Sequence, residues 1–183
     1  GFETNLEFIN LRLSQGSVSM LPKDVIQVGN ELWISDQSRD RIYRYSATTT
    51  PAYLGEITGG MDNIRGMAYD AARDAVWVSN AGTENGAPGD AIIRVQASTG
   101  TIVGSFPVGP APAGSPFDIE VLPDGMLAVS EVDSDTVQVY TADGTLMGAW
   151  ADTSGMGFPQ QIARYGSNYI VAAFSATTGV YEF

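Results

Sequence analysis

The stretch MLAVSE, residues 126–131, decides the fold of this chain, because close relatives of it occur at ELWISD (31–36) and AVWVSN (75–80). Each is an apolar run that ends on an acidic or amide side chain. Short runs of this kind, bounded by turn residues, are typical of buried β-strands. Their repetition predicts that one strand is built several times in a modular architecture.

A longer recurring unit surrounds each copy of this strand. A fourth copy is read at YIVAAF (169–174), so that the column of terminal residues is Asp36, Asn80, Glu131 and Phe174. A strand precedes each copy, at PKDVIQV (22–28), IRGMAYD (64–70), PFDIEVL (116–122) and PQQIARY (159–165). A third segment begins at Asp40, Asp90, Asp135 and Thr178, and a fourth has a central glycine in YLGEI, IVGSF and LMGAW. Turn residues such as Asp124-Gly125 separate these segments, which predicts a four-stranded antiparallel meander.

The spacing of the units predicts an all-β fold, a β-propeller of four-stranded antiparallel blades. The third positions of the first strands are 42, 52 and 43 residues apart, which is the length of a propeller blade. Residues 1–183 are expected to form a single domain. We place an N-terminal closing strand and connection at 1–21, and blades 1 to 4 at 22–63, 64–115, 116–158 and 159–183.

Ring closure is a separate question, because the fourth unit contains only three strands. Residues 6–13, LEFINLRL, read as a spare strand at the distance expected of a fourth strand. Pairing this strand with blade 4 would close a four-bladed ring and remove an exposed edge. The alternative is that the chain is a section of a larger propeller.

The third unit resembles a known repeat. PFDIEVLPDGMLAVSEVDSDTVQVYTADGTLMG (116–148) is similar to an NHL or YVTN type propeller repeat, and the resemblance extends over residues 22–183. Families of this shape include peptide-binding and scaffold modules, lyases and calcium-dependent lactonases. The resemblance therefore implies a propeller fold, but it does not select one function among these families.

Composition excludes several kinds of chemistry within these 183 residues. The sequence contains no cysteine and no histidine, which excludes thiol nucleophiles, Ser-His-Asp triads and imidazole metal sites. A formal net charge of −12 makes nucleic acid and anionic membranes unfavourable partners. No apolar run is long enough for a membrane helix, so membrane insertion is not expected.

The candidate site lies where the inner strands begin, on the face that carries the long loops 80–90, 107–116 and 151–158. The residues expected around the axis as ligand-binding candidates are Asp24, Arg65, Asp118, Gln160 and Gln161. If a metal is bound, the available oxygen ligands predict calcium, held by Asp24, Asp118, Asn80 and Glu131. The simpler interpretation is that these acceptors cap loops, or that Asp24 or Asp118 pairs with Arg65.

The function expected from this pattern is that of a non-catalytic extracellular propeller, a binding or scaffold module of a larger secreted or surface assembly. The acidic, lysine-poor composition favours a bacterial exported protein. Its partner would be a protein or a small polar ligand on the long-loop face. The alternative is a calcium-dependent, lactonase-like hydrolase with an axial site, which the resemblance supports only in part.

Overall fold

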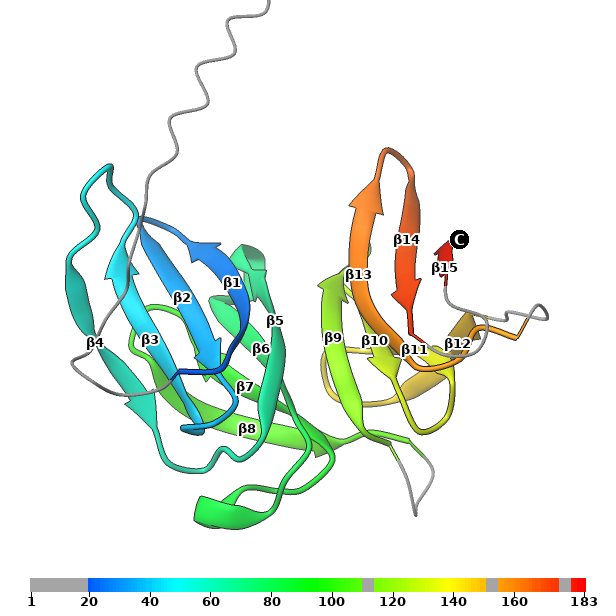
Figure 1. Cartoon of the computed structure of the whole chain (residues 1–183), viewed down its shortest axis with the longest axis horizontal. Helices are drawn as coiled ribbons and strands as arrows, with labels where there is room; N and C mark the ends of the chain where they lie inside the picture. Colours follow the sequence, from blue (N-terminus) through cyan, green and yellow to red (C-terminus); the bar gives the residue numbers. More distant parts are fainter. Residues whose placement is uncertain (1–19, 110–113, 151–154, 175–178) are drawn as a thin grey trace, which may run out of the picture.

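The computed structural model describes residues 20–109, 114–150, 155–174 and 179–183. These residues form four antiparallel sheets, here called blades 1 to 4 (Figure 1). Blade 1 contains β1 (Pro22–Val28), β2 (Glu31–Asp36), β3 (Arg41–Ser46) and β4 (Tyr53–Thr58). Blade 2 contains β5 (Ile64–Asp70), β6 (Ala75–Asn80), β7 (Ala91–Gln96) and β8 (Thr101–Pro107). Blade 3 contains β9 (Pro116–Val121), β10 (Leu127–Glu131), β11 (Thr136–Tyr140) and β12 (Leu146–Trp150).

Blade 4 has three strands in the described residues, β13 (Pro159–Tyr165), β14 (Asn168–Ala173) and β15 (Gly179–Glu182). The helices in the described part of the chain are two short 3-10 turns, η1 (Ala71–Arg73) and η2 (Glu84–Gly86). In every blade, neighbouring strands are consecutive in sequence and antiparallel. The predicted all-β fold of meander blades is therefore confirmed.

The register of blade 4 corrects the predicted alignment by one residue. Pro22 pairs with Asp36 and Pro116 with Glu131, but the equivalent Pro159 pairs with Ala173 and not with Phe174. The fourth copy of the motif is therefore NYIVAA (168–173). The short apolar run is compatible with either frame, and only the pairing partner decides between them because a slip of one residue reverses the faces of a strand.

Packing between blades forms the hydrophobic core. Trp33 of blade 1 lies in a buried cluster with Ile64, Met67 and Val78 of blade 2. Trp77 of blade 2 lies in the corresponding cluster with Leu127 and other residues of blade 3. Both tryptophans are fully buried, so these two side chains pack between blades. A sheet that is covered on both faces has apolar side chains on both faces of its strands. The second strands of blades 1 to 3, β2, β6 and β10, have this pattern.

The blades follow one another around the inner strands β1, β5, β9 and β13, and each inner strand packs against the next. No packing of comparable extent joins β13 to β1 among the described residues. The predicted closing strand, residues 6–13, lies outside the described part of the chain, so closure by this strand stays a prediction.

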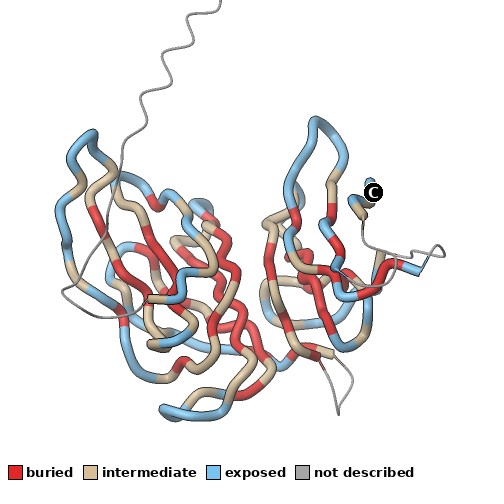
Figure 2. The backbone as a smooth tube through the Cα atoms, viewed as in Figure 1, coloured by how far each residue is buried: buried red, intermediate tan, exposed pale blue. Residues whose placement is uncertain are grey.

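The outward face of blade 4 is the exposed end of this series (Figure 2). One position shows the difference: Ile42, Ile92 and Val137, at matching places in blades 1 to 3, are 0% exposed, whereas Val180 is 71% exposed. Ala163, Ala172 and Tyr165 are exposed as well. Each of the first three blades is thus buried by its successor, and the fourth presents the same kind of face without a described cover.

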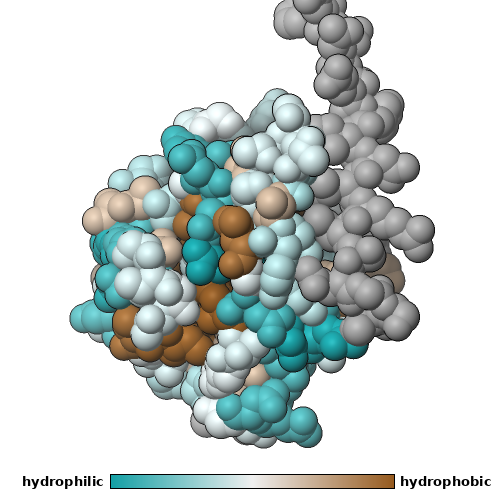
Figure 3. Space-filling view, turned by 90° about the vertical axis from the view of Figure 1, so that its left-hand side faces the viewer, coloured by the Kyte–Doolittle hydropathy of each residue, from teal (hydrophilic) through white to brown (hydrophobic). Residues whose placement is uncertain are grey.

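The outer surface mixes apolar and polar residues. Seen from the side of blade 1, hydrophobic areas are interrupted by hydrophilic ones (Figure 3). Exposed large apolar side chains on the outer strands include Leu54 of β4, Val103 of β8 and Met147 of β12. In the described residues no helix has the length and apolar character needed to cross a bilayer.

Candidate functional site

The strand motif contains a serine in blades 1 to 3, and this serine joins its blade to the next one. The Ser35 hydroxyl donates a hydrogen bond of 2.5 Å to the carbonyl oxygen of Arg65, and the Ser130 hydroxyl donates one of 2.6 Å to that of Gln160. Ser79 donates similarly to Phe117, at 2.8 Å. These serines were missed as candidates by sequence reasoning, although a serine precedes the terminal polar residue in all three copies.

Asp24 and Asp118 make a second link between neighbouring blades. Oδ2 of Asp24 accepts a hydrogen bond of 2.7 Å from the backbone N–H of Met67, and Oδ2 of Asp118 accepts one of 2.8 Å from that of Ile162. Burial raises the pKa of Asp24, and it raises the pKa of Asp118 to about 7, with a further contribution from the negative charge of Asp24. The two carboxylates are thus close enough to interact, and both are engaged in blade-to-blade bonds.

Gly66 of β5 occupies the position in blade 2 that Asp24 occupies in blade 1 and Asp118 in blade 3. A Cβ atom at Gly66 would lie 2.7 Å from the Phe117 carbonyl oxygen and would collide with the Asp118 side chain. Blade 3 therefore approaches blade 2 more closely than a side chain at this position permits. This steric limit explains why the column of aspartates is interrupted here.

The other predicted axial residues do not join the aspartates. Nη1 of Arg65 donates hydrogen bonds to the Ser115 hydroxyl and the Pro116 carbonyl, at 2.9 and 3.2 Å, and the guanidinium lies 5.3 Å from the centre of the Phe117 ring. The predicted pairing of Arg65 with Asp24 or Asp118 is therefore wrong. Burial lowers the pKa of Arg65.

Gln160 and Gln161 lie at the start of β13, the innermost strand of blade 4. Gln160 takes part through its backbone carbonyl, which accepts the bond from Ser130. The side chain of Gln161 is exposed and stands where Asp24 and Asp118 stand in blades 1 and 3. Among the described residues the Gln161 side chain makes no equivalent of the aspartate link, so this kind of connection is seen from blade 1 to blade 2 and from blade 3 to blade 4.

Asn80 holds the long loop 81–90 in place. Its Oδ1 accepts a hydrogen bond of 2.7 Å from the N–H of Asp62, and its Nδ2 donates to the carbonyls of Gly82 and Gly89 at 2.8 and 2.6 Å. Asp62 in turn accepts from the N–H of Glu84 at 2.7 Å. The predicted loop-capping role is confirmed for Asn80, because every polar atom of its side chain is used.

Glu131 is completely buried and contacts the hydroxyl of Tyr140 at 2.8 Å. The same hydroxyl lies 2.6 Å from Oε1 of Gln138 and accepts a bond from the N–H of Gly109 at 2.8 Å. Oε2 of Glu131 has no hydrogen-bond partner among the described residues. The single phenolic proton cannot serve both oxygen acceptors at once, and a protonated Glu131 would donate to Tyr140 and leave that proton to Gln138. This agrees with burial, which raises the pKa of Glu131 to about 7.

The carboxylates of the predicted calcium set do not gather into one cluster in the described residues. The described residues contain no group of three or more Asp, Glu, His or Cys side chains that could hold a metal ion. Asp24, Asp118 and Glu131 are each tied into a different hydrogen-bond network, and both ends of the Asn80 amide are occupied. The structure therefore does not assemble these four residues as a ligand set.

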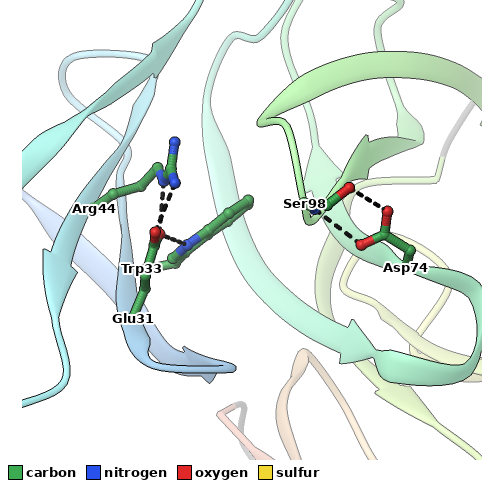
Figure 4. A network of polar contacts seen from close by, with 5 residues as sticks. All are labelled: Glu31, Trp33, Arg44, Asp74 and Ser98. Carbon is green, nitrogen blue, oxygen red and sulfur yellow. Dashed lines mark hydrogen bonds and ion pairs between the residues drawn. The ribbon is translucent and has the colours of Figure 1, made fainter.

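Two separate polar networks, one in blade 1 and one at the turns of blade 2, were also missed by sequence reasoning (Figure 4). Glu31 binds Arg44 through two hydrogen bonds of 2.7 Å and accepts a third, of 2.8 Å, from the indole of Trp33. Asp74 accepts from both the N–H and the hydroxyl of Ser98. Glu31, Arg44, Asp74 and Ser98 are among the residues that line a cavity of about 290 Å³. Because these charged groups are already paired, the cavity is lined by structural contacts.

Comparison with known proteins extends the fold assignment. No protein-family model matches the sequence, and no curated protein matches it. Virginiamycin B lyase from Staphylococcus aureus, solved as a catalytically inactive histidine-to-alanine variant with quinupristin, is similar with a TM-score of 0.63 and 18% identity over 88% of this chain and 55% of that one. Hydrazine synthase from Kuenenia stuttgartiensis is similar with a TM-score of 0.69 and 15% identity, over 94% of this chain and 48% of that one.

BamB from Moraxella catarrhalis is similar with a TM-score of 0.58 and 15% identity, over 87% of this chain and 42% of that one. The chain thus spans about half the length of the solved structures that it matches. At these identities the likeness concerns the fold alone. Together with the four meander blades, it shows that this chain has the β-propeller fold.

Proposed function

We propose that this chain is a non-catalytic binding module, a propeller whose long-loop face receives a protein or a small polar ligand. The observation that carries the proposal is the anchoring of loop 81–90, which the side chains of Asn80 and Asp62 hold through hydrogen bonds. Rigid scaffolds place binding surfaces on long loops that are held in this way. The half-buried Arg65, beside Phe117 on the same side, is a cation that has no carboxylate in hydrogen-bond contact among the described residues.

Two comparisons support a binding role. The lyase from Staphylococcus aureus was solved with quinupristin after a histidine was replaced to make it inactive, and these 183 residues contain no histidine. BamB is a second propeller of similar fold. We propose further that the repeat is of the NHL or YVTN type and that the protein is secreted or displayed on a bacterial surface, as part of a larger assembly.

The rival proposal is a calcium-dependent, lactonase-like hydrolase, and one experiment separates the two. Hydrolysis of a panel of lactones and aryl esters is measured with 1 mM calcium and with chelator, for the wild type and for Asp118→Asn. A non-catalytic module leaves every rate at the buffer value. Calcium-dependent hydrolysis that disappears in Asp118→Asn would overturn the proposal and establish the rival.

Melting curves test the same distinction without activity. A site that binds calcium in the folded state raises the free energy of unfolding by about 2.7 kcal/mol when the free metal is a hundred times its dissociation constant. The module proposed here melts at the same temperature with calcium and with chelator. A calcium-dependent rise in the wild type that is absent in Asp118→Asn supports the metal site.

A further inference from the structure

An aromatic cleft lies between blades 3 and 4, away from the residues considered above. Its volume is about 670 Å³, within the range of small-molecule sites. It is lined by three aromatic rings and three polar side chains among other residues: Trp150, Tyr169, Phe183, Asp124, Ser167 and Asn168. Nothing in the proposed function of the long-loop face uses this cleft.

The three rings pack against one another at the cleft. The ring of Trp150 lies 5.5 Å from that of Phe183 at an interplanar angle of 25°, and 5.2 Å from that of Tyr169 at 34°. Trp150 is in contact with both neighbours, so the three rings form one apolar cluster that lines the cleft. A box for a quaternary ammonium group needs instead rings that turn their faces to one central point. The geometry thus favours a flat ligand with an apolar face over a compact cation.

Polar side chains lie at the edge of the same cleft. Asp124 lies at the exposed β9–β10 turn, where Oδ1 accepts from the N–H of Met126 and Oδ2 has no hydrogen-bond partner within the described part of the chain. Ser167 and Asn168 form the β13–β14 turn, where the Ser167 hydroxyl donates to Asn168. The hydroxyl of Tyr169 is buried without a hydrogen-bond partner in the described structure. Oxygen and amide groups therefore border an apolar cluster of rings.

We propose that this cleft binds a neutral pyranose ring of a glycan. The C–H face of a pyranose is apolar and stacks on the negatively polarised face of an aromatic ring, while its hydroxyls project around the rim toward carboxylate, amide and hydroxyl groups. Asp124 and the net charge of −12 disfavour an anionic sugar. The ligand is thus an uncharged hexose or N-acetylhexosamine unit of an oligosaccharide.

The test is calorimetric titration of the intact chain with neutral hexasaccharides of glucose, mannose, galactose and N-acetylglucosamine. At least one of them is expected to bind saturably, with an affinity unchanged between 50 and 500 mM salt. Trp150→Ala is expected to weaken binding at least tenfold, and Trp150→Phe, which retains an aromatic face, by no more than about threefold. Tyr53→Ala, an exposed aromatic residue of β4 outside the cleft, serves as the control and leaves affinity unchanged.

Because Trp150→Ala can disturb folding, Asp124→Ser provides a second variant at an exposed turn, and it is expected to weaken binding about fivefold or more with an unchanged melting temperature. No binding of any of the four sugars overturns the proposal. Binding of tetramethylammonium without sugar binding overturns it in favour of a cation site. Sugar binding that survives both Trp150→Ala and Asp124→Ser places the glycan elsewhere and also overturns it. None of these results depends on the long-loop face.

Discussion

The hydroxyl of Ser130 links two blades, since it accepts a hydrogen bond of 2.9 Å from the N–H of Asp118 in its own blade and donates one of 2.6 Å to the carbonyl of Gln160 in the next. A single buried atom thus satisfies a donor and an acceptor that belong to different sheets. Its counterpart Ser35 makes the same pair of contacts, with Asp24 and Arg65. Blade stacking in this chain is specified by hydrogen bonds as well as by apolar packing.

Ser130→Ala should destabilise the protein by about 1 to 3 kcal/mol, because it leaves a buried N–H and a buried carbonyl without partners. The measurement is the free energy of unfolding in urea. The matched control is Ala172→Ser, the reverse change at the equivalent position of blade 4, which is exposed; its effect should stay within about 0.5 kcal/mol. Equal effects of the two substitutions would contradict the linking role.

Gly66→Ala should be destabilising by about 1 to 3 kcal/mol or more, since the added methyl group meets the Asp118 side chain and the Phe117 carbonyl of the next blade. Gly104→Ala is the control, because a Cβ atom there meets nothing within 4 Å. Thermal melting of both variants provides the comparison. A Gly66→Ala protein as stable as the wild type would show that the two blades can separate without cost.

Val137 and Val180 occupy matching positions on two blades, but one is completely buried and the other is 71% exposed. Val137→Ala should cost about 2 kcal/mol through lost burial and the cavity left behind. Val180→Ala should change the free energy of unfolding by less than about 0.5 kcal/mol. The free energies of unfolding of the two variants, measured by chemical denaturation, isolate the effect of the covering blade. A large loss for Val180→Ala would mean that its face is covered in solution.

Stability should fall as pH rises from about 4.5 to about 7. Burial raises the pKa of both Asp118 and Glu131 to about 7, so in this window the folded state holds protons that the unfolded state has released. Each group then lowers the free energy of unfolding by up to about 1.4 kcal/mol per pH unit. Above about pH 7 both states are ionised at these groups and the dependence ends.

Melting temperatures between pH 4 and 8 test this dependence. Glu131→Gln keeps a neutral side chain of the same size and should remove the part of the slope that Glu131 contributes, and Asp118→Asn should do the same for Asp118. Parallel curves for the wild type and both variants would show that the slope comes from general charge repulsion, which both variants share.

Many residues of the candidate site could be predicted from the sequence, because they occupy equivalent positions in successive repeats. The polar residues at the ends of the strands were recognised because they recur, and the loop-capping role of Asn80 followed from its place at the end of a buried strand. The partners of these residues could not be read, since Met67 and Ile162 take part only through backbone N–H groups that every residue possesses. The raised pKa of Glu131 depends on its burial, which is set by packing.

By itself, the sequence determined the repeating strand, the length of the blade, the meander order and the absence of thiol and imidazole chemistry. These properties are local, because they depend on period, on turn residues and on composition. Only the tertiary structure decided the frame of β14, the pairing of Arg65 with Ser115 and Pro116 instead of an aspartate, and the cleft formed by Trp150, Tyr169 and Phe183. Each of these depends on which atoms of different strands meet, and a register shift of one residue or a side-chain contact across blades leaves no periodic trace in the chain.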